Sequence, residues 1–278
     1  MTTGFINVNK PSGAPSSAAV NKIKKLLHTP CGHMGTLDPL ASGVLPVGVG
    51  NAARLFDYFL SKKKVYLAEF TFGVTSDTLD SEGQLEYKGE RPKREDILEV
   101  IPSLIGEIDQ IPPRYSAKCV NGKRGYQLAR EGKEFTLAPK RVLIESISLC
   151  EEKGEGRFTF EIVCGGGTYI RSIARDMGEK MGTFAIMSAL RRTQSGVFTI
   201  ENSVPQNDLT QENIESFLIP TDSVLPYPVL EWNNFHIFHG LPVKSKQADG
   251  LYKVYDDNGF YGIAEVKSGQ AVMKTKLC

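Results

Sequence analysis

Alternation of apolar and polar residues predicts strands in several parts of the chain. In the stretch 65–72, every second residue is aromatic or small and apolar, beginning with Tyr66. This period of two is typical of a strand with one buried face. Similar alternation or short apolar runs predict further strands at 5–8, 44–49, 141–150, 157–164 and 190–198, with 141–150 and 157–164 forming an antiparallel pair.

Apolar residues three and four positions apart predict helices between these strands. The stretch 168–180 carries Ile170, Ile173, Ala174 and Met177 on one stripe. Helices are also expected after Ser16 or Ser17, either of which can cap its helix, and at 52–60, 93–105 and 212–218, with Pro102 breaking or kinking the third. Strands and helices in this arrangement indicate an α/β (α+β) domain.

The C-terminal quarter differs from the rest of the chain. The stretch 220–228 is rich in proline and reads as a linker, and short strands and turns follow it. We therefore expect one large domain at 1–222 and a small β domain at 229–278.

Composition excludes several classes of protein. The net charge is +1, the five cysteines form no Cys-x-x-Cys pair, and the four histidines lack metal-ligand spacing. These features favour reduced thiols over a disulfide framework or a zinc site. No signal-type or membrane-spanning apolar run is present, so we expect a cytoplasmic protein with no bound metal and no membrane association.

The glycine-rich stretch 32–43 contains a single carboxylate, Asp38, followed by Pro39. Glycines permit unusual backbone angles, and a proline restricts the residue before it, so this loop has a defined shape. A carboxylate held among apolar neighbours is a candidate for catalysis. The alternative is an ordinary turn aspartate that caps a backbone amide.

Two segments are locally basic. Residues 110–134 interleave arginines and lysines with tyrosines, a composition suited to nucleic acid, although a solvent-exposed excursion would look the same. The lysines at 22, 24 and 25 read as a solvated helix face, with a phosphate-facing surface as the alternative.

Five short motifs, in order along the chain, resemble those of one enzyme family. The loop at 32–43 is similar to the catalytic motif of the TruB-type tRNA pseudouridine synthases. Asn-Lys-Pro-Ser-Gly at 9–13 with the serines at 16–17, Lys-Val-Tyr at 64–66, Gly-Thr-Tyr-Ile-Arg at 167–171 and Leu-Arg-Arg at 190–192 resemble its other motifs. The resemblance implies that 1–222 is the catalytic domain. The segment 110–134 corresponds to the family's RNA-gripping insertion, at about 110–135. Met34, Asn9 and Pro15 depart from the family pattern, but none replaces a residue with a chemical role.

The resemblance implies a fold and a reaction. The fold is a mixed, mostly antiparallel sheet flanked by helices, with a PUA-like C-terminal domain. The reaction is isomerisation of uridine to pseudouridine at position 55 in the T loop of tRNA, with the target base flipped out of its stack. It requires no cofactor and no metal. The expected partner is the T arm of tRNA, bound by a monomer without an obligatory protein partner.

The resemblance also assigns roles to individual residues. Asp38 acts at ribose C1′ as nucleophile, base or charge stabiliser, and Arg171 lies against it. Tyr66 packs on the uracil. From the pattern alone, Tyr66 could equally be a core aromatic. Likewise, Arg171 could be a surface helix arginine and His33 an ordinary loop histidine. The implied set is catalytic Asp38, Tyr66 and Arg171; substrate-binding His33, Tyr66, Tyr169 and Leu190; and RNA-binding Lys64, Asp77, Lys123, Arg124 and Arg191. Lys62, Lys63 and Arg192 are expected to contact phosphates as well, and Lys10 and Pro11 to support the loop.

Three other functions remain possible from the sequence. A guide-RNA-dependent synthase shares the motifs but needs partner proteins. An RNA-binding or RNA-chaperone module would not need Asp38. A glycoside hydrolase also places carboxylates at C1′, but it would require a second positioned acid, and Asp77 or Asp80 could serve only if folding happened to bring it there.

Overall fold

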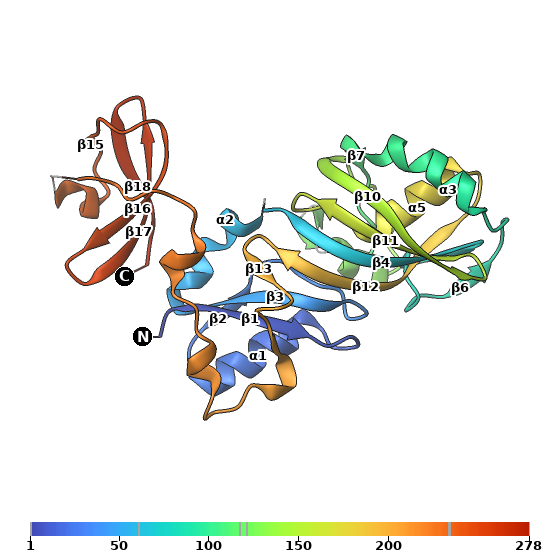
Figure 1. Ribbon diagram of the computed structural model, residues 1–278, viewed down its shortest axis with the longest axis horizontal. Coiled ribbons are helices and arrows are strands. Elements are labelled where there is room, and N and C mark those ends of the chain that lie inside the picture. The colour runs from blue at the N-terminus through green and yellow to red at the C-terminus, as the bar shows by residue number, and fades with distance from the viewer. Residues whose placement is uncertain (1, 61, 117, 121, 233–234, 278) are drawn as a thin grey trace.

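The computed structural model describes residues 2–60, 62–116, 118–120, 122–232 and 235–277. A ten-stranded mixed sheet runs through most of the molecule (Figure 1). Its main path has the order β14-β1-β3-β12-β4-β11-β10-β7, with β2 paired to β3 and β13 to β12. The β1–β14 and β3–β12 pairs are parallel, and the other described pairs of this sheet are antiparallel. The strands of this sheet are β1 (Gly4–Lys10), β2 (Cys31–His33), β3 (Ser42–Val49), β4 (Lys64–Phe72), β7 (Gly106–Gln110), β10 (Lys140–Gly154), β11 (Arg157–Cys164), β12 (Ala185–Ser195), β13 (Phe198–Thr199) and β14 (Val204–Pro205).

Helices cover the two halves of the sheet separately. In Figure 1, α3 and α5 pack beside β10 and β11, whereas α1 lies below β1, β2 and β3. The α-helices are α1 (Ser16–Leu27), α2 (Phe56–Leu60), α3 (Arg94–Val100), α4 (Gly125–Arg130) and α5 (Ile170–Lys180). Short 3-10 helices occupy Gly50–Leu55, Ile101–Leu104, Gln206–Asp208, Ile214–Phe217, Thr221–Val224 and Phe235–His239. Two small hairpins are β5 (Val74–Ser76) with β6 (Leu85–Tyr87), and β8 (Cys119–Val120) with β9 (Lys123–Arg124).

The periodicities seen in the sequence correspond to buried faces. Every second residue of β4 from Tyr66 to Phe72 is buried, and the apolar stripe of α5 is buried in the same core. The predicted strand at 65–72 and the predicted α5 stripe are therefore confirmed.

The two halves of the sheet meet where β3 runs parallel to β12. The paired stretch of the two strands is short: Arg191 lies opposite Ser42, and Arg192 lies opposite Gly43. Gly43 has φ +99°, and a Cβ on it would lie 2.2 Å from the Arg192 carbonyl oxygen, so glycine is required. Because the Asp38 loop leads directly into β3, this junction places the loop at the centre of the molecule.

The C-terminal strands form a separate antiparallel sheet with its own small core, at the left of Figure 1. Its strands are β15 (Val243–Lys244), β16 (Gly250–Asp256), β17 (Gly259–Lys267) and β18 (Gln270–Lys276). The expected linker at 220–228 is in part a packed segment, because Val224 and Leu225 are buried in a cluster with Phe5 and Phe59. Asn51 and Arg54 donate to the carbonyls of Leu277 and Lys276, which joins the C-terminal sheet to the rest.

Some local expectations were wrong in detail. Pro15, not a serine, occupies the N-cap of α1, because the Ser16 hydroxyl is engaged with the Asp38 loop. The predicted helix at 212–218 is only a 3-10 turn, and that at 52–60 begins as one. The strand expected at 190–198 starts five residues earlier, at Ala185, where it extends the pairing with β4.

Candidate active site

The side chain of Arg171 is the centre of the site. It lies in the first turn of α5 and is 5% exposed. Its Nε lies 3.0 Å from Asp38 Oδ2, and its Nη2 donates to Asp38 Oδ1 at 3.1 Å. This two-point contact fixes both the position and the orientation of the carboxylate.

The remaining donors of Arg171 bind three other groups. Nη1 lies 3.3 Å from Asp80 Oδ2 and donates to the Thr78 carbonyl, and Nη2 donates to the Tyr115 carbonyl. Asp80 is itself 4% exposed and accepts from Thr78 Oγ1 and the Glu82 amide. One guanidinium thus connects the Asp38 loop, the 78–80 loop and the start of the predicted RNA-binding insertion.

Asp38 combines a buried environment with access to solvent. Its side chain is 33% exposed, whereas that of Arg171 is 6% exposed. Burial raises the pKa of Asp38, the Arg171 guanidinium opposes this, and the nearby Asp80 carboxylate adds to the increase. The site therefore presents a positioned carboxylate to an incoming ligand.

The N-terminal motif supports this loop from below. Lys10 is fully buried, and its Nζ donates to the carbonyls of Pro11, Ala14 and Pro39. The Ser16 hydroxyl donates to the Leu37 carbonyl and accepts from the Leu37 amide. These bonds bracket Asp38 on both sides, as expected for Lys10.

Replacing Lys10 should loosen the loop. Burial lowers the pKa of Lys10 to about 8, so the ammonium is still largely charged at pH 7. Lys10→Met leaves three carbonyls without their donor, and we expect the free energy of unfolding to fall by about 1–3 kcal/mol. Urea unfolding measures this, with Lys25→Met, an exposed lysine of α1, as the control that should change little. Equal stability of Lys10→Met and the wild type would contradict a structural role.

The other expected substrate-binding residues come from four different elements, and two of them are coupled to Asp38. Tyr66, on β4, and Tyr169, which caps α5, both lie within the electrostatic influence of Asp38. Leu190 is 8% exposed on β12 and lies opposite Ala68 of β4. His33 ends β2, and burial, followed by the influence of Arg192, lowers its pKa. Its Nδ1 is buried and has no hydrogen-bond partner among the described residues.

The expected RNA-binding residues divide into exposed and buried groups. Lys123 and Arg191 are exposed, and exposed Asp77 accepts from the Gln84 amide, which orders its own loop. The side chain of Arg124 lies outside the described part of the structure. Lys64 is 5% exposed and donates to the Lys62 carbonyl, so its assignment to phosphate contact was wrong: alternation along β4 turns it inward.

The same correction applies to Arg192. It was grouped with Arg191 as a phosphate contact, but it is 1% exposed, because adjacent residues of a strand face opposite sides. Asp80 was considered only as a possible second acid, and the structure makes it a partner of Arg171 instead. Its acidic loop, containing Asp77, Asp80 and Glu82, was the available signal, but nothing in the local pattern indicated which carboxylate would turn inward.

The base of the insertion is anchored on α5. Gln110 accepts from the Tyr169 amide and donates to the Tyr169 carbonyl, and Ser172 donates to the Ile111 carbonyl. Beyond this base, Lys123 and Lys133 both pair with Glu131.

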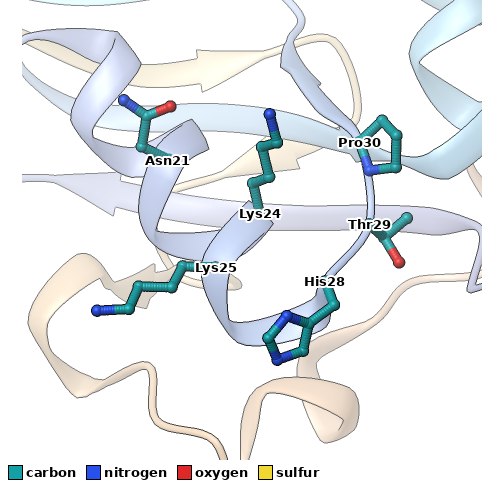
Figure 2. Close-up of a pocket in the computed structure, with 6 residues that line it drawn as sticks. All are labelled: Asn21, Lys24, Lys25, His28, Thr29 and Pro30. Atoms are coloured by element: carbon teal, nitrogen blue, oxygen red, sulfur yellow. The ribbon is translucent and has the colours of Figure 1, made fainter.

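A separate hollow lies at the end of α1 (Figure 2). The residues that line it are Asn21, Lys24, Lys25, His28, Thr29 and Pro30, so neither Asp38 nor Arg171 is part of its lining. Lys24 and Lys25 are exposed, and Lys22 donates to the carbonyls of Gln206 and Asn207. The described residues include no cluster of three or more His, Cys, Asp or Glu side chains that could hold a metal. No helix in the described ranges is long and apolar enough to cross a bilayer.

Comparison with known proteins agrees with the geometry. Residues 24–170 match the TruB family pseudouridylate synthase N-terminal domain, and residues 171–226 match the tRNA pseudouridylate synthase B C-terminal domain. The chain is 40% identical to tRNA pseudouridine synthase B of Clostridium kluyveri over 97% of this chain and 98% of that protein. It is 38% identical to the enzyme of the same name from Pseudomonas syringae, over 99% and 95% of the two chains.

Solved structures show the same fold. A chain in the crystal structure of a Cbf5-Nop10-Gar1 complex superposes with a TM-score of 0.73 at 24% identity, covering 99% of this chain and 85% of that one. The expected mixed α/β pseudouridine synthase fold with a small C-terminal β domain is therefore confirmed. With a family model matched over more than half of its residues and full-length relatives at this identity, the chain belongs to the TruB family of pseudouridylate synthases and is an isomerase.

Proposed function

We propose that the enzyme converts uridine to pseudouridine at position 55 in the T loop of tRNA, with Asp38 acting at ribose C1′ of a flipped-out nucleotide. The observation that carries this proposal is the partly exposed Asp38 carboxylate held at two points by buried Arg171. The names of the relatives support tRNA as the substrate.

The chemistry requires a carboxylate of this kind. The bond from C1′ to uracil N1 breaks, and C1′ becomes electron-poor before it rejoins uracil at C5. An ionised Asp38 can bond to C1′, stabilise its charge or remove a sugar proton. Arg171 favours the ionised form, and its contacts with Asp80 and two carbonyls hold it in place while Asp38 reacts.

The residues assigned around Asp38 suit a base that is flipped out of its stack. The glycosidic bond is inaccessible in a stacked loop, so the base must leave the stack. Tyr66 then packs against uracil with its hydroxyl near C5, Tyr169 and Leu190 line the pocket, and His33 occupies the space that the base vacates. Lys123, Arg124, Arg191 and Asp77 contact or position the RNA.

The direct test is pseudouridine mapping on an unmodified tRNA transcript. Conversion of the T-loop uridine by the purified enzyme is the expected result. Conversion of another uridine would retain the chemistry but contradict the substrate site. A folded protein that binds tRNA but forms no product would leave the RNA-binding alternative in place.

Activity should be lost in acid as Asp38 becomes protonated. Burial raises the pKa of Asp38, so the acid limb of the rate should lie above the ordinary carboxyl pKa of about 3.8. Asp80 contributes to that increase; Asp80→Asn should therefore move the limb to lower pH, even where its maximum rate is reduced. Single-turnover rates from pH 4 to 8 measure the acid limb of the wild type and that of Asp80→Asn. An unshifted limb in Asp80→Asn would contradict the coupling of the two carboxylates.

Binding of tRNA should weaken steeply with salt, because exposed lysines and arginines displace counterions from phosphates. Each phosphate contact contributes a slope of about −0.7 to −0.9 in log K against log salt. Lys123→Gln should reduce the magnitude of this slope by about one contact, as measured by filter binding from 50 to 300 mM salt. Lys64→Gln should leave the slope unchanged, since Lys64 is buried. A flat salt response in the wild type would contradict the proposed RNA surface.

We also propose that the enzyme works in the cytoplasm as a monomer without a protein partner. Light scattering of the purified enzyme should give 30.6 kDa. A dimer mass would contradict the monomer. Activity that depends on an added protein would favour the guide-dependent alternative.

A further inference from the structure

The start of α5, the helix that carries Arg171, is held from outside the helix. Tyr169 occupies the N-cap with extended backbone angles, and its side chain makes no capping hydrogen bond to the helix as the structure describes it. Tyrosine lacks the short side-chain acceptor that Ser, Asp or Asn supplies at this position. The chain reaches Tyr169 through three consecutive glycines at 165–167, the last with φ +85°. The local sequence therefore defines this helix start only loosely.

Gln110, the last residue of β7, supplies the contact that the helix start needs. Its side chain is buried in the protein, with Gln110 only 1% exposed. Its Oε1 accepts from the Tyr169 amide at 2.8 Å, and its Nε2 donates to the Tyr169 carbonyl at 3.1 Å. A buried amide is costly unless both of its ends are bonded, and here both bonds go to the backbone of one residue. Gln110 thus fixes the peptide groups on both sides of Tyr169.

Arg171 follows this fixed point by two residues. It lies in the first turn of α5, and its guanidinium holds Asp38 at two points. The Tyr169 carbonyl, to which Gln110 donates, also accepts from two backbone amides of that first turn. Gln110 therefore bears on the position from which the helix, and the arginine on it, begins.

Other hydrogen bonds join the same two segments without involving Tyr169. The Ser172 hydroxyl and Arg175 Nη2 both donate to the Ile111 carbonyl, at 2.9 and 3.1 Å. These bonds hold the base of the predicted insertion on α5, whereas Gln110 acts on the residue at which the helix begins. Mutation can therefore separate docking of the insertion from placement of the helix start.

We propose that Gln110 is a positioning residue for the Asp38–Arg171 pair. By fixing the backbone of Tyr169, it sets the start of α5 at the point from which Arg171 reaches both carboxylate oxygens of Asp38. The expected effect on the reaction rests on the proposed function, but the effect on the Asp38 carboxylate does not require turnover. A change at Gln110 should impair the reaction step more than it impairs RNA binding.

The first test compares Gln110→Met with the wild type. Methionine has a similar length, but it offers no donor and only a weak acceptor to the backbone of Tyr169. We expect the single-turnover rate on an unmodified tRNA transcript, at saturating enzyme, to fall about 10- to 100-fold, because a misplacement of about 1 Å can cost 100-fold. The Kd for tRNA, measured by filter binding, should stay within about threefold.

The pKa of Asp38 provides a readout that does not depend on turnover. Burial raises this pKa, Arg171 opposes the increase, Asp80 adds to it and Lys10 opposes it. If Arg171 is displaced, the pKa of Asp38 should rise further, because the ionised carboxylate loses part of its partner. With ¹³Cγ-labelled aspartate, the Asp38 resonance, assigned by its loss in Asp38→Asn, should titrate at higher pH in Gln110→Met than in the wild type. The acid limb of the rate should move in the same direction.

Two further variants make the result specific. Ser172→Ala removes a bond between the insertion base and α5 but leaves Gln110 bound to Tyr169. This variant should leave the Asp38 titration unchanged. In the double variant of Gln110→Met with Arg171→Lys, the rate should fall little further than in Arg171→Lys alone, because both changes act on the same arginine.

A second substitution covers the case in which Gln110→Met does not fold, as judged by urea unfolding. Gln110→Asn keeps a neutral amide at this buried position, but it is one methylene shorter and cannot reach both backbone groups of Tyr169. We expect it to change the rate and the Asp38 titration in the same directions, by smaller amounts.

The outcomes are distinguishable. An unchanged Asp38 titration in a folded Gln110 variant would overturn the positioning role, and so would rate losses that multiply fully with those of Arg171→Lys. A wild type that forms no pseudouridine would contradict the proposed function, and the Asp38 titration would still decide the role of Gln110.

Discussion

Asp38→Asn should lower pseudouridine formation by roughly 10⁴-fold or more, the scale seen when a reacting side chain is removed, without loss of the fold. Asparagine has nearly the same shape as aspartate and keeps an oxygen that can accept from Arg171. It carries no negative charge, however, and cannot bond to C1′ or remove a proton.

Stability and binding should survive this change. Burial already disfavours the charged form of Asp38, and in the variant Arg171 keeps its contacts with Asp80 and the carbonyls of Thr78 and Tyr115. We expect the free energy of unfolding to change by about 1 kcal/mol or less, the scale of one net hydrogen bond, and the Kd for tRNA to stay within about twofold.

Single-turnover product formation, filter binding and urea unfolding on the same preparation test these expectations together. Asp57→Asn, an exposed aspartate of α2, is the matched control and should behave as the wild type. More than about 1% of the wild-type rate in Asp38→Asn would mean that Asp38 is not the reacting group.

Loss of Arg171 should affect both stability and catalysis. Arg171→Met would leave Asp38 and buried Asp80 without their shared cation, and breaking a buried ion pair in this way typically costs about 3–5 kcal/mol. Arg171→Lys retains the charge but cannot bind Asp38 at two points; we expect a rate loss of about 100-fold, because positioning errors of this kind are costly.

The role of Asp80 can be separated from that of the cation. Asp80→Asn keeps the shape of the 78–80 loop but weakens one anchor of Arg171, so the rate should fall about tenfold, the effect of roughly 1.4 kcal/mol on the barrier. In the double variant with Arg171→Lys, the losses should be less than additive, because both changes act on one network. Arg175→Lys, one turn further along α5, is the control. Fully additive losses would mean that Asp80 acts independently of Arg171.

Local patterns in the sequence were sufficient for many elements of this protein. The alternation in β4 and the apolar stripe of α5 identified their buried faces, because one-sided burial imposes a period of two on strands and of 3.6 on helices. The glycines and Pro39 around Asp38 identified a shaped loop with one carboxylate. The order of the five motifs identified the family, and with it the fold.

Only the tertiary structure decided which charged residues lie inside. Lys64 and Arg192 belong to basic runs that look like surface, yet pairing of β4 with β11 and β12 buries both. Asp80 lies 91 positions before Arg171 in the chain, and only the packing of its loop against α5 brings the two together. The burial of a charge depends on register and on contacts between distant segments, and neither leaves a periodic trace in the sequence. The sequence therefore singled out Asp38 as the candidate carboxylate, whereas the fold determined that Arg171 holds it, that Asp80 pairs with the same guanidinium, and that Arg192 lies opposite Tyr66.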